Sequence, residues 1–144
     1  MQTTKQTVGF LERVPLFTGL KHRQLEALAK RFVERDYPAG AAIVTQGQGG
    51  EGFFVIVAGG AEAVRERDDG EKVVVNTFGP TDYFGEMALL DDGLRTASVC
   101  ATEATRCLVL ARWDFLAVMR EDADAAVTVL VELARRFRRA LEAL

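Results

Sequence analysis

The sequence predicts a mainly β domain, folded as a barrel or roll, with helices before and after it. Three observations predict this class. Between residues 41 and 80, short runs rich in Val, Ile and Phe alternate with glycine-containing turns, a pattern typical of closely spaced strands. The segment before residue 37 instead carries apolar residues at helical spacing, and residues 124–144 contain neither proline nor glycine, as expected for a long helix.

The N-terminal segment predicts two short helices. Apolar residues lie at helical spacing within residues 8–14, and Pro15 ends that run. Residues 23–32 carry a second apolar stripe at steps of three and four. Residues 37–40, Tyr-Pro-Ala-Gly, then end the helical region. The single histidine, His22, falls beside the second helical stretch, and we expect it at the surface.

The central segment predicts a series of strands. The runs that we expect to form them are residues 43–46, 53–58, 61–67, 72–78, 96–101 and 106–111. Asp69-Gly70 is a strong candidate for a hairpin turn between two of these runs. The only cysteines, Cys100 and Cys107, fall within the last two runs, so we expect buried thiols there in preference to a disulfide or a metal site.

The C-terminal segment predicts a short helix over residues 114–120 and a long one over residues 124–144. The long helix carries one apolar stripe with steps of three and four, formed by Val127, Leu130, Ala134, Phe137, Leu141 and Leu144. This spacing is that of a heptad seam shared with a second copy of the chain. The alternative is that the stripe packs on the β structure of the same chain; we favour the seam, and hence a homodimer.

Composition sets limits on function. The 144 residues fit a single domain, and the net charge of −3 predicts no general attraction to nucleic acid or to an anionic membrane. The longest strongly apolar run, residues 53–58, is far too short to span a bilayer. The first ten residues lack the charged-then-apolar order of a signal peptide, so we expect a cytoplasmic protein.

The most specific feature is a pair of segments, residues 84–90 (Phe-Gly-Glu-Met-Ala-Leu-Leu) and residues 95–99 (Arg-Thr-Ala-Ser-Val). Gly85 allows the main chain to approach a ligand closely, and the residues after it can open a helical turn whose free N–H groups favour an anion. Arg95 offers a planar fork of donors for two phosphate oxygens, and Glu86 an acceptor for a sugar hydroxyl. The residues alone also allow a surface ion pair between Glu86 and Arg95, which would contribute little.

The two segments together resemble the phosphate-binding cassette of the cyclic nucleotide-binding domain, the module found in the catabolite activator protein, protein kinase A regulatory subunits and cyclic nucleotide-gated channels. The order of helices, β-roll and helices is also that of this family. Other positions that look like the family's recurrent ones are residues 37–40, Gln46-Gly47, residues 53–57, Gly60 and residues 82–84.

The resemblance implies a fold and a division of the chain. The fold would be a double-stranded β-helix, a jelly-roll-like β-roll, within a single domain spanning residues 1–144. Residues 1–36 would form N-terminal helices, residues 37–111 the β-roll with its cassette at 84–99, and residues 112–144 the C-terminal lid and dimer helices.

The resemblance also implies roles for the cassette residues. Glu86 would accept from the ribose 2′-hydroxyl, and Gly85 would let the backbone lie against the ribose. Arg95 would pair with the exocyclic oxygens of the cyclic phosphate. The N–H groups of Ala88 and of Thr96 or Ala97 would complete the phosphate site. Phe84, at the start of the cassette, is included among the ligand-binding residues.

The base would lie against apolar strand residues. By position, Val64, Val75 and Met87 are candidates for its walls, and Asn76 for a contact with its edge. In the last helix, Leu133 and Arg136 lie at about the place where the family caps the base. The alternative for Arg136 and its neighbouring arginines is a solvated face that suits the helix macrodipole.

Thr96 bears on which nucleotide is bound. Family members that accept cyclic GMP often carry Thr immediately after the cassette Arg, where its hydroxyl can meet the guanine amino group. Many that prefer cyclic AMP carry Ala or Ser, although some cyclic AMP responders also carry Thr. The bacterial-type resemblance of the whole chain favours cyclic AMP, with cyclic GMP as the alternative.

The function that this implies is a Crp/Fnr-like sensor in signal transduction, which binds a cyclic nucleotide and transmits its occupancy through the C-terminal helix to a downstream partner. We expect no other cofactor and no metal. We do not expect an enzyme, because metal-dependent β-barrels need several histidines and no nucleophile–base pair is visible. The chain stops at Leu144, before any helix-turn-helix, so direct nucleic acid binding is not expected. A ligand-free dimerisation domain of a larger transcriptional regulator is the alternative.

Overall fold

The architecture is that of a computed structural model, which describes residues 2–49, 52–91 and 93–144. The chain divides into two compact units. One is helical and contains residues up to 31 and from 113 onward; the other contains the strands, in residues 32–112. The expected class, mainly β with flanking helices, is therefore confirmed.

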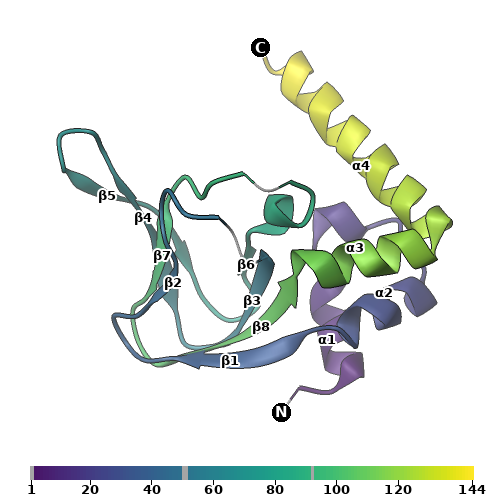
Figure 1. Ribbon diagram of the computed structural model, residues 1–144, viewed down its shortest axis with the longest axis horizontal. Coiled ribbons are helices and arrows are strands. Elements are labelled where there is room, and N and C mark those ends of the chain that lie inside the picture. Colours follow the sequence, from purple (N-terminus) through teal and green to yellow (C-terminus); the bar gives the residue numbers. More distant parts are fainter. Residues whose placement is uncertain (1, 50–51, 92) are drawn as a thin grey trace. The chain divides into compact units, whose positions relative to one another are not determined.

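The strand unit is a β-roll of two antiparallel four-stranded sheets (Figure 1). The first sheet has the order β1-β8-β3-β6, with β1 at Val33–Tyr37, β8 at Thr105–Ala111, β3 at Gly52–Ala58 and β6 at Tyr83–Phe84. The second has the order β2-β7-β4-β5, with β2 at Ala42–Val44, β7 at Ser98–Ala101, β4 at Ala61–Glu66 and β5 at Lys72–Phe78.

The core of the roll lies between the two sheets, because both sheets contribute buried apolar residues to one cluster. Its members are Ile43, Val44, Phe54, Ile56, Ala61, Ala63, Phe84, Val99, Ala101, Cys107 and Val109. Phe54 stacks on Phe84 with ring centroids 5.0 Å apart. Burying each large side chain of this kind contributes about 1.5–3 kcal/mol, so the cluster holds β6, and the cassette that follows it, against the sheet.

Two strands differ from the sequence-based expectation. The first four residues of β1 lie in the segment assigned to the N-terminal helices, residues 1–36, and β6 was not expected as a strand. Local composition does not reveal β1, because three of its five residues are charged and its conformation comes from pairing with β8, where Val33 faces Val109 and Tyr37 faces Thr105. β6 is only two residues long and is defined by its pairing with β3.

The helical unit contains α1 (Thr4–Leu11), the 3₁₀ turn η1 (Pro15–Phe17), α2 (His22–Ala29), α3 (Arg112–Glu121) and α4 (Ala123–Glu142). The first residue of α3 belongs to the strand unit. α1 begins and ends earlier than expected, and a capping box formed by Thr3 and Gln6 sets its start. Inside the unit, the rings of Phe17 and Phe115 lie 6.2 Å apart.

Asp122 caps α4 and ties it to α2. Its Oδ1 accepts from the Ala125 N–H at 3.1 Å, and its Oδ2 accepts from Gln24 Nε2 at 3.3 Å and from Arg23 Nη1 at 2.9 Å. A side-chain cap satisfies one of the N–H groups that the first turn leaves open. The start of the long helix is therefore fixed by three donors.

The apolar stripe of α4 faces solvent in the single chain. The side chains of Val127, Leu130, Phe137 and Leu141 are each more than half exposed, with Phe137 at 67%. Within the part of the chain that the structure describes, no helix is both long enough and apolar enough to cross a membrane. His22 begins α2 and is exposed, as expected. Cys100 and Cys107 lie in β7 and β8 as free thiols; Cys107 is buried and Cys100 half-buried.

Candidate functional site

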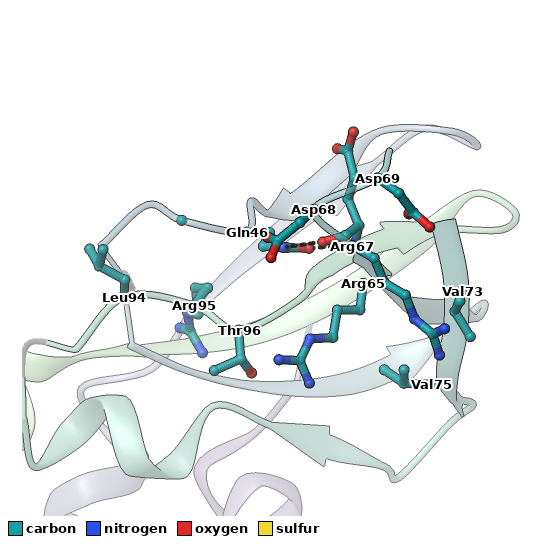
Figure 2. Close-up of a pocket in the computed structure, with 12 residues that line it drawn as sticks. Gln46, Arg65, Arg67, Asp68, Asp69, Val73, Val75, Leu94, Arg95 and Thr96 are labelled. Carbon is teal, nitrogen blue, oxygen red and sulfur yellow. Dashed lines mark hydrogen bonds between the residues drawn. The ribbon is translucent and has the colours of Figure 1, made fainter. Parts of the chain in front are cut away.

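One pocket opens on the second sheet of the roll. It has a volume of about 850 Å³, and Figure 2 shows the residues that line it. They come from the segment after β2, from β4, β5 and the turn between them, and from the segment before β7. The lining residues are Gln46, Gly47, Arg65, Glu66, Arg67, Asp68, Asp69, Val73, Val75, Leu94, Arg95 and Thr96.

Arg95 is held in place by both its backbone and its side chain. Its N–H donates to the Gln48 carbonyl at 2.9 Å, and its carbonyl accepts from the Gly47 N–H at 2.9 Å. Its Nη2 donates to the Gly52 carbonyl at 2.7 Å. The side chain is half-buried, so the charged group is partly sheltered from water, where charge-assisted bonds are stronger.

Gly85 lies directly against this guanidinium. A Cβ at position 85 would lie 2.6 Å from Arg95 Nη1 and 2.6 Å from the Gly52 carbonyl oxygen. The backbone is also left-handed there, with φ at +85°, a conformation that favours glycine. Both facts require glycine. The group that lies close to Gly85 in this structure is the Arg95 guanidinium, and the close approach of a ligand to this backbone stays a prediction.

The turn expected after Gly85 is present as the 3₁₀ helix η2, Glu86–Leu89. The Ala88 N–H, expected to reach the phosphate, donates at 3.0 Å to the Gly85 carbonyl. A ligand would have to share or replace that bond. Among the described residues, in contrast, no protein acceptor is found for the N–H groups of Thr96 and Ala97, which follow Arg95.

A second pocket, of about 470 Å³, lies at the other half of the cassette. Its lining contains Asn76, Thr77, Phe78, Asp82, Tyr83, Phe84, Gly85 and Glu86. The structure thus divides the expected ligand-binding residues: Val75, Arg95 and Thr96 line the first pocket, whereas Phe84, Gly85, Glu86 and Asn76 line the second. The contact between Gly85 and the Arg95 guanidinium connects the two groups.

Five other residues expected to contact the ligand or cap its base lie outside the linings of these two pockets. Val64 is half-buried in β4, and Ala97 packs against the roll's core. Met87 is half-exposed at the surface of η2. Leu133 and Arg136 lie on α4, in the helical unit, where both are half-buried. None of these residues lines either pocket of the roll.

Sequence reasoning missed Arg65 and Arg67, two further cations of the first pocket. It also gave no role to the Gln46 side chain, whose Nε2 donates to the Glu66 carbonyl at 2.8 Å and whose Oε1 accepts from the Glu66 N–H at 2.7 Å. This pair of bonds joins the segment after β2 to the end of β4. The two-residue alternation of β4 was a signal that could have found Arg65.

The described residues contain no group of three or more His, Cys, Asp or Glu side chains arranged to hold a metal ion. The pocket's charged atoms are instead guanidinium groups and carboxylates. In Figure 2 the side chains of Arg65 and Arg95 extend to the same side as Thr96, away from Asp68 and Asp69 near the hairpin turn. This arrangement suits an anionic ligand with a polar and partly apolar body.

The amino-acid sequence is similar to those of known proteins. The family profile described as "Cyclic nucleotide-binding domain" matches residues 34–122, more than half of the chain. The Cyclic AMP receptor protein of Thermus thermophilus is 37% identical over 126 residues, which are 88% of this chain and 58% of that protein. A cAMP-dependent protein kinase regulatory subunit of Mycosarcoma maydis is 41% identical over 96 residues, 67% of this chain and 18% of that protein.

Solved structures agree with the sequence comparisons. The N-terminal domain of a transcriptional regulator from Streptomyces coelicolor superimposes with a TM-score of 0.85 at 28% identity, covering 94% of this chain and 96% of that one. The regulatory domain of Toxoplasma gondii PKA, crystallised with cAMP, gives a TM-score of 0.73 at 30% identity and covers 80% of this chain and 44% of that one. The chain spans 58% of the length of the first bacterial relatives that it matches.

Proposed function

The chain belongs to the cyclic nucleotide-binding domain family, and from this membership we propose that it is a regulatory module that binds cyclic AMP in the pocket beside Arg95. One observation carries the proposal. The Arg95 guanidinium is seated against Gly85 and the Gly52 carbonyl at the edge of a pocket that also contains Thr96 and Val75.

Phosphate capture follows from the groups next to one another in the chain. Arg95 supplies a fixed positive charge with two donor edges, and the N–H groups of Thr96 and Ala97 lie next to it in the backbone. These groups can hold the two exocyclic oxygens of a cyclic phosphate by charge-assisted bonds. Glu86, at the first position of η2, accepts from the ribose 2′-hydroxyl, and Val75 covers one face of the base.

Cyclic AMP is the first candidate because the bacterial relatives are named as a cyclic AMP receptor and as cAMP-activated regulators. Cyclic GMP is the second candidate. The exposed Thr96 lines the same pocket as Val75, and its hydroxyl can meet the amino group of a guanine that lies against Val75. We propose binding and not catalysis, since the names of these relatives are those of receptors, regulators and regulatory subunits.

The regulatory output is proposed to pass through α4. This helix exposes four large apolar residues along one stripe, and exposed apolar patches of this size favour a protein partner. The α4 helix of a second copy of the chain would bury this stripe by heptad packing. We therefore propose a homodimer whose α4 pair reports nucleotide occupancy to a downstream protein.

The test is calorimetric titration of the purified chain with cyclic AMP and cyclic GMP, before and after Arg95→Ala. Loss of the charged donor should weaken binding about a hundredfold, since hydrogen bonds to charged groups contribute about 1.5–3 kcal/mol each. Lys72→Ala, which removes an exposed cation of β5 outside the pocket lining, is the control and should change affinity little. Unchanged affinity in Arg95→Ala, with the fold intact by circular dichroism, would contradict the proposal.

The role of Glu86 has a separate test. Replacing Glu86 with Ala should weaken cyclic AMP binding, and 2′-deoxy cyclic AMP should then bind as well as the natural ligand. If the unmodified protein already binds both ligands equally, Glu86 does not contact the 2′-hydroxyl. If neither ligand binds, the chain is the ligand-free dimerisation module considered as the alternative.

A further inference from the structure

Strand alternation directs Arg65 into the first pocket. Ala61 and Ala63 of β4 are buried in the core between the sheets, and every second residue of a strand shares a face. Arg65 is therefore on the core-facing side of β4, two residues nearer the open end of the roll. Its partner across the sheet is Val73 of β5, and directly opposed residues lie on the same face.

A β-bulge brings a second apolar residue to the same place. Pairing of β4 with β5 steps from Ala63–Asn76 to Val64–Val74, so that Val75 has no partner in the register and is the extra residue of the bulge. Val75, Val73 and Arg65 all line the pocket. A planar base lying against the two valines would present its edge to Arg65.

The Arg65 guanidinium is available to a ligand. The side chain is exposed, and within the described ranges it forms no ion pair and no side-chain hydrogen bond with the protein. Arg95, in contrast, is anchored on Gly52. The two arginines therefore have different tasks: Arg95 is fixed at the phosphate position, and Arg65 stands across Thr96 from it, on the side of Val75 (Figure 2).

We propose that Arg65 is a base-selecting residue, which favours guanine over adenine by donating two hydrogen bonds to the O6 and N7 acceptors of guanine. This inference rests on the proposed binding of a cyclic nucleotide. A guanidinium carries donors and no acceptor, so it matches the two acceptors of guanine, whereas adenine offers one acceptor beside an amino donor. Arg65 thus raises the affinity for cyclic GMP relative to cyclic AMP.

Two other tasks for Arg65 make different predictions. Stacking of the guanidinium on the face of the base would strengthen binding of every purine about equally. General attraction of the phosphate would also act equally on all cyclic nucleotides, and would weaken with salt. Only edge recognition changes the ratio of affinities between bases.

The experiment measures dissociation constants for cyclic AMP, cyclic GMP and cyclic IMP in the unmodified chain, Arg65→Met and Arg65→Lys. Cyclic IMP has O6 and N7 but lacks the 2-amino group, so it separates Arg65 from any contact of Thr96 with that group. We expect Arg65→Met to weaken cyclic GMP and cyclic IMP about tenfold and to leave cyclic AMP within about twofold. Arg65→Lys should restore part of the difference. Lys72→Met, which removes an exposed cation of β5 outside the pocket lining, is the matched control.

The outcomes are separable. If the unmodified chain binds nucleotides and Arg65→Met weakens all three equally, or none, the base-selecting role is wrong and the proposed function stands. If the unmodified chain binds none of them, both are wrong. Thermal unfolding of each variant shows whether the fold is retained, and cyclic AMP binding by Arg65→Met serves as an internal check of the pocket.

Discussion

Replacing Gly85 with alanine tests the contact that joins the two halves of the site. The new Cβ would lie 2.6 Å from both Arg95 Nη1 and the Gly52 carbonyl oxygen. Gly40 provides a matched control, because its φ is also +85° but nothing lies within 4 Å of a Cβ built there. The left-handed backbone alone costs each variant about 1 kcal/mol, so the difference between them isolates the contact.

The magnitude follows from what Arg95 must give up. Displacing the guanidinium breaks its 2.7 Å bond to Gly52, and a hydrogen bond to a charged group contributes about 1.5–3 kcal/mol. Gly85→Ala should therefore lower the free energy of unfolding by about 3 kcal/mol, against about 1 kcal/mol for Gly40→Ala. Urea titration of both variants gives the two values.

Cyclic AMP titration completes this experiment. Gly85→Ala should bind the nucleotide weakly, since Arg95 is moved from its position, whereas Gly40→Ala should bind like the unmodified chain. Equal losses of stability in the two variants would refute the reasoning, because they would show that the Gly85–Arg95 contact contributes nothing beyond backbone conformation.

Three further predictions concern the rest of the chain. Burial raises the pKa of the Cys107 thiol from 9.0 to about 11. The unfolded thiol loses its proton first, so the free energy of unfolding should fall between these two pH values, and it should fall less in Cys107→Ala. At neutral pH, a thiol reagent should modify the half-buried Cys100 before the buried Cys107. The Ala125 N–H bond lowers the pKa of Asp122, so stability should be lost as pH falls through that lowered pKa, and Asp122→Asn should flatten this loss in acid urea titrations. Phe137→Glu should convert a dimer to a monomer by light scattering; a persisting dimer would remove the α4 seam.

The cassette was the most specific prediction made from the sequence, for a physical reason, and its roles in binding a ligand stay predictions. Gly85 and Arg95 have requirements that are local to their own residues: a left-handed backbone at one and a fixed planar charge at the other. The β5 run, residues 72–78, was predicted with the bounds that the structure has, because it is rich in β-branched residues and lies between turn residues.

The parts that were missed depend on distant partners. β1 is a strand because β8 lies beside it, some seventy residues away in sequence, and nothing in its charged composition announces that pairing. Arg65 was missed because its direction depends on the buried alternation of β4 and on the bulge opposite it. A single strand's pattern shows which residues share a face, but it does not show where that face opens into a pocket.

Two hydrogen bonds within the cassette region have a consequence for the proposed nucleotide binding. The Ala88 N–H holds the Gly85 carbonyl, and the Arg95 guanidinium holds the Gly52 carbonyl at the start of β3. A nucleotide bound as proposed would compete with these two internal acceptors for the Ala88 and Arg95 donors. If the proposed binding takes place, we expect the first turn of η2 and the first residue of β3 to loosen. Amide hydrogen exchange should then rise next to the Gly85 and Gly52 carbonyls and fall in the segment around Thr96.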